Sequence, residues 1–100
     1  MKEIQNYIEE AKKNEVVFRI LLDRFQIEHE NLSIEEIFNK YSTGRRPFKW
    51  TILNFRELQP NLFEFGWEDI GVLSGGGSVD HYSMEDTQLL HVKNIYCWMS

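Results

Sequence analysis

Four residues near the C-terminal end of the chain carry side chains that can bind a metal ion or transfer a proton. Asp80 and His81 are adjacent, and His91 and Cys97 follow. Carboxylate, imidazole and thiolate groups are the usual zinc ligands, but the spacing here matches no zinc-binding pattern. A histidine in a strand is more often a packed residue, and one beside a glycine loop is more often a surface residue. We therefore predict no bound metal ion and no cofactor.

The same region allows an acid–base interpretation, in which His91 is oriented by Asp80 or Asp86. Catalysis of this kind also needs a nucleophile within reach of the base and donors for a developing oxyanion. The sequence supplies neither in a recognisable pattern. We predict that the protein is not an enzyme.

The glycine run Gly75-Gly76-Gly77 follows a predicted strand, and consecutive backbone N–H groups can bind a phosphate. The run lacks the Gly-Lys-Ser/Thr ending of a P-loop, and the segment around it contains no cation. We instead predict a loop over 75–78 that can adjust to a partner.

A single basic cluster, Arg45-Arg46-Pro47-Phe48-Lys49-Trp50, alternates cations with aromatic rings. This composition suits contact with a nucleic-acid backbone and stacking on bases. With a helix before it and an alternative helix starting at Pro47, the cluster is also compatible with a helix-turn-helix. Three cations are few for a DNA site, so we favour a charged loop with Phe48 and Trp50 in the core.

The net charge of −5 comes entirely from the second half of the chain. The first fifty residues hold nine acidic and nine basic side chains, whereas the last fifty hold seven acidic and two basic ones. No lysine or arginine lies between Arg56 and Lys93. A surface built from this segment repels phosphate and attracts cationic proteins. We predict a basic protein partner and no direct contact with nucleic acid or membrane.

Aromatic and acidic residues alternate over 61–69, so a strand there would place three rings on one face and acids on the other. The common outcome is that the rings face the core and the acids face solvent. Aromatic side chains outside the core would anchor a partner, with Trp67 and Tyr82 as the candidates. The predicted partner-binding residues are Glu64, Trp67, Glu68, Asp69, Asp80, Tyr82, Glu85 and Asp86.

The elements that position these residues begin with an apolar stripe of helical spacing, which predicts one helix over 2–27. Asn14 is a weak helix former and marks a point for a break. Ser33 and Glu36 form a capping box that predicts the start of a second helix, over 34–42.

Strands are predicted in the second half. Residue types favour a strand over 48–58, although a helix also fits its pattern. Further strands are predicted over 62–67 and 70–73, or as one strand bent at a glycine. Residues 88–99 carry apolar side chains on both faces, which predicts a central, covered strand.

These elements indicate an α+β fold, with two N-terminal helices packed on a C-terminal antiparallel sheet of three to four strands. A chain of 100 residues and 12.0 kDa suits one domain, 1–100, with one core. The 42% of hydrophobic residues and the lack of a long apolar run exclude a disordered chain and a spanning helix. The acidic N-terminal residues and the lone Cys97 favour the cytoplasm.

The predicted function is that of a small acidic protein-binding module that neutralises a basic macromolecular partner. An immunity protein for a nuclease toxin and a phage-encoded inhibitor are examples of this class. One alternative is a nucleic-acid-binding regulator of helix-turn-helix type that uses the Arg45 to Trp50 region. Another is a structural assembly subunit joined through free strand edges and the aromatic row.

Overall fold

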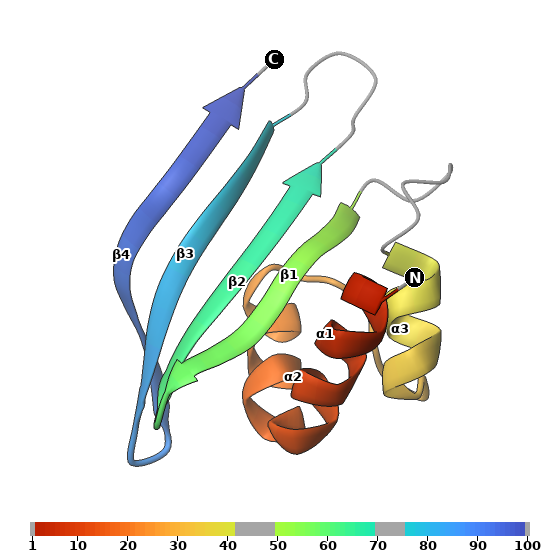
Figure 1. The fold of residues 1–100 in the computed structure, drawn as a ribbon, viewed down its shortest axis with the longest axis horizontal. Helices are drawn as coiled ribbons and strands as arrows, with labels where there is room; N and C mark the ends of the chain where they lie inside the picture. The colour runs from red at the N-terminus through yellow and green to blue at the C-terminus, as the bar shows by residue number, and fades with distance from the viewer. Residues whose placement is uncertain (1, 42–49, 70–75, 100) are drawn as a thin grey trace.

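The computed structural model describes residues 2–41, 50–69 and 76–99, with helices preceding strands (Figure 1). The helices are α1 (Lys2–Lys13), α2 (Glu15–Arg24) and α3 (Ile34–Tyr41). The strands are β1 (Trp50–Gln59), β2 (Leu62–Asp69), β3 (Gly76–Glu85) and β4 (Gln88–Met99). This confirms the predicted α+β fold, with a third helix because the first predicted helix is divided in two.

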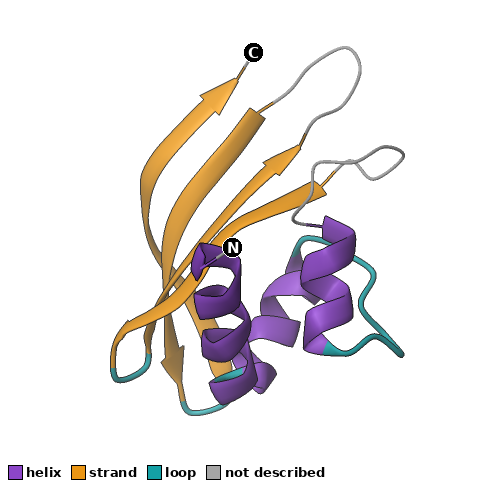
Figure 2. Ribbon diagram, turned by 45° about the vertical axis from the view of Figure 1, so that its right-hand side comes forward, coloured by secondary structure: helices purple, strands orange, loops and turns teal. Residues whose placement is uncertain are grey.

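The strands form one antiparallel sheet in chain order, so that β1 and β4 are its edges. The helices lie against one face of the sheet and nearest to β1, and β4 is the strand furthest from them (Figure 1, Figure 2). We call the face toward the helices the inner face and the opposite face the outer face. Within the described ranges, no helix has the length and apolar character needed to cross a membrane.

The predicted continuous helix over 2–27 is wrong, because the chain leaves helical geometry at Asn14. That residue has φ −127° and ψ 45°, and its side-chain amide donates to the Glu10 carbonyl oxygen at 3.2 Å. A side chain that competes for the backbone carbonyls explains why the break falls here. At the other end of α2, Gln26 adopts a φ of 58°, and Ile27 donates back to the Leu22 carbonyl at 2.8 Å. This closing bond ends the helix at the turn.

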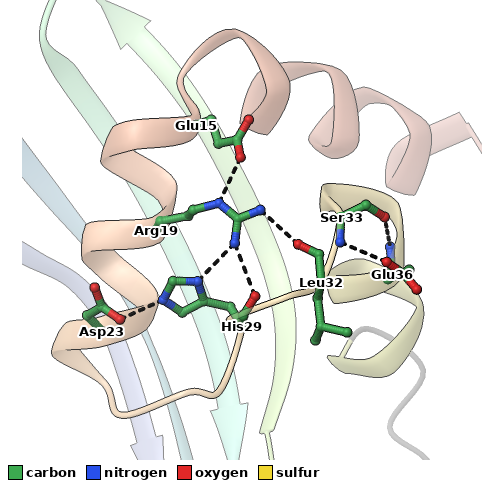
Figure 3. Close-up of polar contacts among 7 residues, drawn as sticks. All are labelled: Glu15, Arg19, Asp23, His29, Leu32, Ser33 and Glu36. Carbon is green, nitrogen blue, oxygen red and sulfur yellow. Dashed lines mark hydrogen bonds and ion pairs between the residues drawn. The ribbon is translucent and has the colours of Figure 1, made fainter.

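The capping box predicted before α3 is confirmed (Figure 3). The Ser33 backbone N–H donates to Glu36 Oε1 at 2.8 Å, and the Glu36 backbone N–H donates to Ser33 Oγ at 3.1 Å. Two N–H groups that the helix leaves without partners are therefore satisfied by side chains. The hydrogen bonds from Ser33 also hold the pKa of the Glu36 carboxyl below its usual value of 4.5.

Arg19 fastens α2 to the loop that precedes α3 (Figure 3). Its guanidinium donates to His29 Nδ1 at 3.0 Å, to the His29 carbonyl at 3.1 Å and to the Leu32 carbonyl at 2.8 Å, and it also pairs with Glu15. The His29 Nε2–H donates to Asp23 at 2.6 Å. Because an arginine can only donate, the bond to Nδ1 fixes the neutral tautomer of His29 that carries its proton on Nε2.

We expect Arg19→Met to lower the free energy of unfolding by about 1.5 kcal/mol, because the side-chain stem is kept while bonds to two carbonyls are lost. Urea unfolding measures the effect. Lys13→Met is the matched control, since Lys13 is exposed and makes one ion pair, to Glu10 at 3.6 Å. Equal stability of the two variants would contradict a fastening role for Arg19.

The hydrophobic core lies between the helices and the inner face of the sheet. The Phe18 ring of α2 stacks on Phe38 of α3 at 5.3 Å and meets Phe55 of β1 at 5.0 Å between ring centroids. Phe63 and Phe65 of β2 complete the buried aromatic row. The predicted packing of this row against the helices is therefore correct.

Of the next two strands, β1 agrees with the sequence-based expectation and β3 differs from it. Trp50–Gln59 is the strand β1, as the residue types favoured. Gly76–Glu85 is the strand β3, although a loop was predicted over 75–78 and no strand over 79–85. Residues 70–73, where a further strand was predicted, lie outside the described residues.

The prediction that 88–99 is a central, covered strand is wrong, because β4 is an edge strand. Its pairing with β3 contains two bulges. Tyr96 pairs with Val79 and Asn94 with Asp80, so Ile95 has no partner on β3, and Val92 is left without one in the same way. Each such bulge changes the alternation of the strand and increases its local twist.

Candidate functional site

The predicted partner-binding residues do not gather on one surface. On β2, Trp67 points to the inner face and Glu68 to the outer face, because neighbouring strand residues alternate. Glu68 pairs with Gly77 near the start of β3, whereas Glu85 and Asp86 lie at the turn after its other end. Asp69 ends β2 opposite Gly76. The strands adjoin as expected, but their acids are divided between two faces and two ends.

Asp80 lies on the inner face, beyond the cover of the helices, and is almost enclosed by polar partners. Its side chain is 9% exposed. Oδ2 accepts from the Ser78 hydroxyl at 2.6 Å, and Oδ1 accepts from Asn94 Nδ2 and His91 Nε2, both at 2.9 Å. Burial raises the pKa of the Asp80 carboxyl, but these bonds outweigh burial, and the pKa lies below its usual value of 3.8. We call Ser78, Asp80, His91 and Asn94 the Asp80 cluster.

The Asp80 cluster has the residue types of a hydrolytic triad in a different arrangement. In a Ser-His-Asp triad the imidazole lies between the hydroxyl and the carboxylate and takes the hydroxyl proton. Here the carboxylate lies between Ser78 and His91, and both of them donate to it. The predicted contact of His91 with Asp80 is present, but it does not activate Ser78 as a nucleophile.

Glu64 has a similar environment on the outer face of the sheet. Its side chain is 11% exposed, and its Oε1 accepts from Asn54 and from Arg56, the latter at 3.0 Å. Oε2 accepts from His81 Nε2 at 3.0 Å. Burial raises the pKa of the Glu64 carboxyl, and the bonds from His81, Asn54 and Arg56 together lower it below the usual 4.5.

His81 and His91 therefore point to opposite faces of the sheet, each to its own carboxylate. They do not converge with Asp80 and Cys97 on a single point, as a metal site built from these residues would require. In the described part of the chain, no group of three or more histidine, cysteine, aspartate or glutamate side chains could hold a metal ion.

Trp67 and Tyr82, the two aromatic residues proposed as anchors outside the core, both point toward the helices. The Trp67 ring lies 5.6 Å from that of Phe25, which follows α2. Tyr82 is buried, with the Arg24 guanidinium 5.8 Å from its ring centroid. Burial, with a smaller effect of Asp80, raises the pKa of the Tyr82 hydroxyl to about 12. Neither side chain is free to anchor a partner in this conformation.

The exposed apolar side chains of the sheet lie mainly on β4, where the sequence predicted a covered strand. Leu90, Val92, Ile95 and Tyr96 are all exposed, and Tyr96 reaches 60%. We call these four residues the β4 strip. A sheet whose strands pair in chain order must end in an edge strand, and this rule is the signal that would have found the strip.

The proposed helix-turn-helix does not form, because β1 begins at Trp50 where the second helix would run. Arg45 to Lys49 lie outside the described residues. A hollow of about 490 Å³ lies between α1 and β1, with Glu9, Glu10 and Glu57 beside Lys13 and Arg56 in its lining. Glu10 is already used there, because its Oε1 accepts from the Glu57 backbone N–H at 2.9 Å.

Comparison of the chain with models of protein families, with curated proteins and with solved structures gave no match.

Proposed function

We propose that this chain is a non-catalytic protein-binding module that docks a basic partner through the β4 strip and the outer face beside it. The observation that carries the proposal is the β4 strip itself, four exposed apolar side chains on the edge strand furthest from the helices. Apolar side chains that gather on one exposed strand, rather than scatter singly, are typical of a docking surface.

The backbone of β4 favours docking through side chains over extension of the sheet. Bulges at Val92 and Ile95 interrupt the regular row of free N–H and C=O groups, and Lys93 lies between them. Bulges and lysines on an edge strand are the features that discourage pairing with a foreign strand. The bulges also direct the two bulged side chains toward solvent. A partner would thus contact the strip as a surface of side chains.

The charge of the chain supports a basic partner. The net charge of −5 attracts a cationic protein over distances comparable to the Debye length, about 8 Å at physiological salt. Glu64 and Asp80 are enclosed by their own donors, and Glu57 lines the hollow between α1 and β1, at the other edge of the sheet. The described acids of the second half that remain to face a partner at β4 are therefore Glu68, Glu85 and Asp86.

Nucleic-acid-handling enzymes carry cationic clefts of the kind such a module can occupy. An immunity protein for a nuclease toxin or a phage-encoded inhibitor acts in this way, in the cytoplasm. The free edge at β4 also suits the alternative role of an assembly subunit, in which a second copy of the chain would cover it.

The test is affinity capture from the native host with the wild-type chain and with the double variant Val92→Ser, Ile95→Ser. We expect a captured protein of high isoelectric point whose affinity falls about thirtyfold in the double variant, because apolar contacts at the centre of an interface carry most of its binding energy. Val16→Ser is the matched control, since Val16 is apolar and 69% exposed but lies on α2.

Equal affinity of the double variant and the control would contradict docking at β4. So would a dimer of the purified chain that dissociates in the double variant, because a second copy would then cover the strip. Sedimentation of the purified protein over a concentration series distinguishes this outcome.

A further inference from the structure

Two aromatic side chains of β4 form a stacked pair on the outer face. The rings of Tyr96 and Trp98 lie 5.4 Å apart between centroids, with 28° between their planes. Both residues are on the outer face, because Tyr96 pairs with Val79 and Trp98 with Gly77, which alternate with inward-pointing Ser78. Tyr96 is among the most exposed apolar residues described. The pair therefore presents aromatic surface to solvent on a face that no helix covers.

Gly77 determines where the indole lies. A Cβ at this position would be 2.3 Å from Cη2 and Cζ2 of Trp98 and 2.6 Å from the Trp67 carbonyl oxygen. Both distances are far below any real contact, so the close approach of the ring requires glycine. The indole consequently lies directly over the backbone of β3 and extends from β4 toward β2.

Glu68 lies in the same cross-strand row, between Thr51 of β1 and Gly77 of β3. It pairs with Gly77, and Gly77 pairs with Trp98, so the three residues cross β2, β3 and β4 on the outer face. Neighbouring strands are about 4.8 Å apart, which places the β2 and β4 backbones about 10 Å apart with only glycine between them. Glu68 is half-buried and makes no hydrogen bond or ion pair within the described residues. The structure thus sets this carboxylate in the same cross-strand row as Trp98, whose stacking partner Tyr96 is exposed.

We propose that the Tyr96–Trp98 pair and Glu68 together bind an arginine side chain of the partner, an inference that rests on the proposed docking at β4. A guanidinium stacks its flat face on an aromatic ring and directs its N–H fork at a carboxylate in the same plane. The exposed Tyr96 ring and the half-buried Trp98 ring supply the stacking surface, and Glu68 supplies the acceptor. A lysine ammonium would gain only part of this, because it has no planar face.

Among the described residues, the outer-face cations Arg56 and Lys93 do not pair with Glu68. Arg56 donates to Glu64 at 3.0 Å, and the same carboxylate also accepts from His81. Lys93 is the cross-strand neighbour of His81 on β3. His81 lies two residues along β3 from Val79, which is the cross-strand neighbour of Tyr96. That separation is about 7 Å along the strand. Glu68 is therefore the acid that the row Glu68–Gly77–Trp98 places nearest to the two rings, and no described cation pairs with it.

The test uses a short peptide of alternating arginine and glycine, added to ¹⁵N-labelled protein and followed by NMR. We expect the indole N–H signal of Trp98 to move on titration, and that of the inward-pointing Trp67 to stay. A peptide with citrulline in place of arginine has the same shape without the charge. We expect it to bind about tenfold more weakly.

The matched variants are Glu68→Gln and Glu85→Gln, which remove one negative charge each. We expect Glu68→Gln to weaken the arginine peptide about tenfold, and Glu85→Gln, at the far turn, less than twofold. Tyr96→Leu keeps an apolar side chain but removes the ring, and we expect a loss of about fivefold. Thermal unfolding of each variant shows that the fold is retained.

Equal weakening by Glu68→Gln and Glu85→Gln would mean that net charge alone attracts the peptide, and it would overturn the arginine site. Binding of the citrulline peptide with unchanged affinity would do the same. Neither result touches the docking proposal, whose test depends on Val92 and Ile95. Conversely, arginine binding that needs Glu68, in a chain that captures no basic protein, would uphold this site and refute the proposed function.

Discussion

Phe18→Ala lowers the free energy of unfolding by about 4 kcal/mol, the largest effect we expect from a single core substitution. Phe18 is fully buried on α2, and its ring contacts Phe38 of α3 and Phe55 of β1. Three elements therefore meet at one side chain, and truncation leaves a cavity between them. The surrounding rings come from separate elements and cannot all move inward to fill it, so the loss lies in the upper part of the usual range.

Urea unfolding followed by circular dichroism measures the change. Val16→Ala on the same helix is the control, because Val16 is 69% exposed and its truncation should cost less than about 0.5 kcal/mol. A loss below about 1 kcal/mol for Phe18→Ala would show that the helices and the sheet do not share one core.

Local signals were enough to predict where the helices lie, but not that the first predicted helix is divided in two. The reciprocal bonds of Ser33 and Glu36 depend on residue types at fixed spacing, and they form as expected. Asn14 marked the break between α1 and α2, although the helices were predicted as one. The alternation of rings and acids on β2 likewise predicted that Phe63 and Phe65 face the core, and both are buried.

The strand β3 escaped prediction because its pattern comes from tertiary contacts. Its residues are glycine, serine, aspartate and histidine in places where strands usually carry apolar side chains. Gly77 allows the close approach of Trp98, and Asp80 accepts hydrogen bonds from His91 and Asn94 of β4. The residue types at both positions are therefore explained by β4 and not by the local sequence of β3. The sequence around them resembles a loop until the neighbouring strand is known.

The candidate site was only partly predictable for a related reason. Acidic residues such as Glu64 and Asp80 count equally in a charge sum, yet both are enclosed by donors from other strands. Glu68 carries the same charge but meets no donor within the described residues, and its neighbour on β3 is Gly77, which has no side chain to offer one. Charge composition supports only the sign of the partner that we propose, and pairing register decides which acids can face it.

Asp80→Ala lowers the free energy of unfolding at neutral pH by about 2.5 kcal/mol, the second large effect that we expect. The substitution removes the common acceptor of Ser78, His91 and Asn94 and leaves their donors facing a partly enclosed site. Hydrogen bonds to an ionised group are worth more than neutral ones, and three of them end on this carboxylate. Glu85→Ala is the control, because Glu85 is an exposed acid at the end of β3.

The effect of Asp80→Ala should also depend on pH, with a sign that follows from the lowered pKa of Asp80. A carboxyl whose pKa is lower in the folded state stabilises the fold when ionised, so its contribution is complete above the usual value of 3.8. It is lost as the pH falls from that value through the folded pKa, because over this range the unfolded state binds the proton more readily than the native state. Urea unfolding from neutrality to about pH 3 should show wild type and variant converging at the acidic end. A difference that stays constant or widens there would mean that the ionised form of Asp80 does not support the junction of β3 and β4.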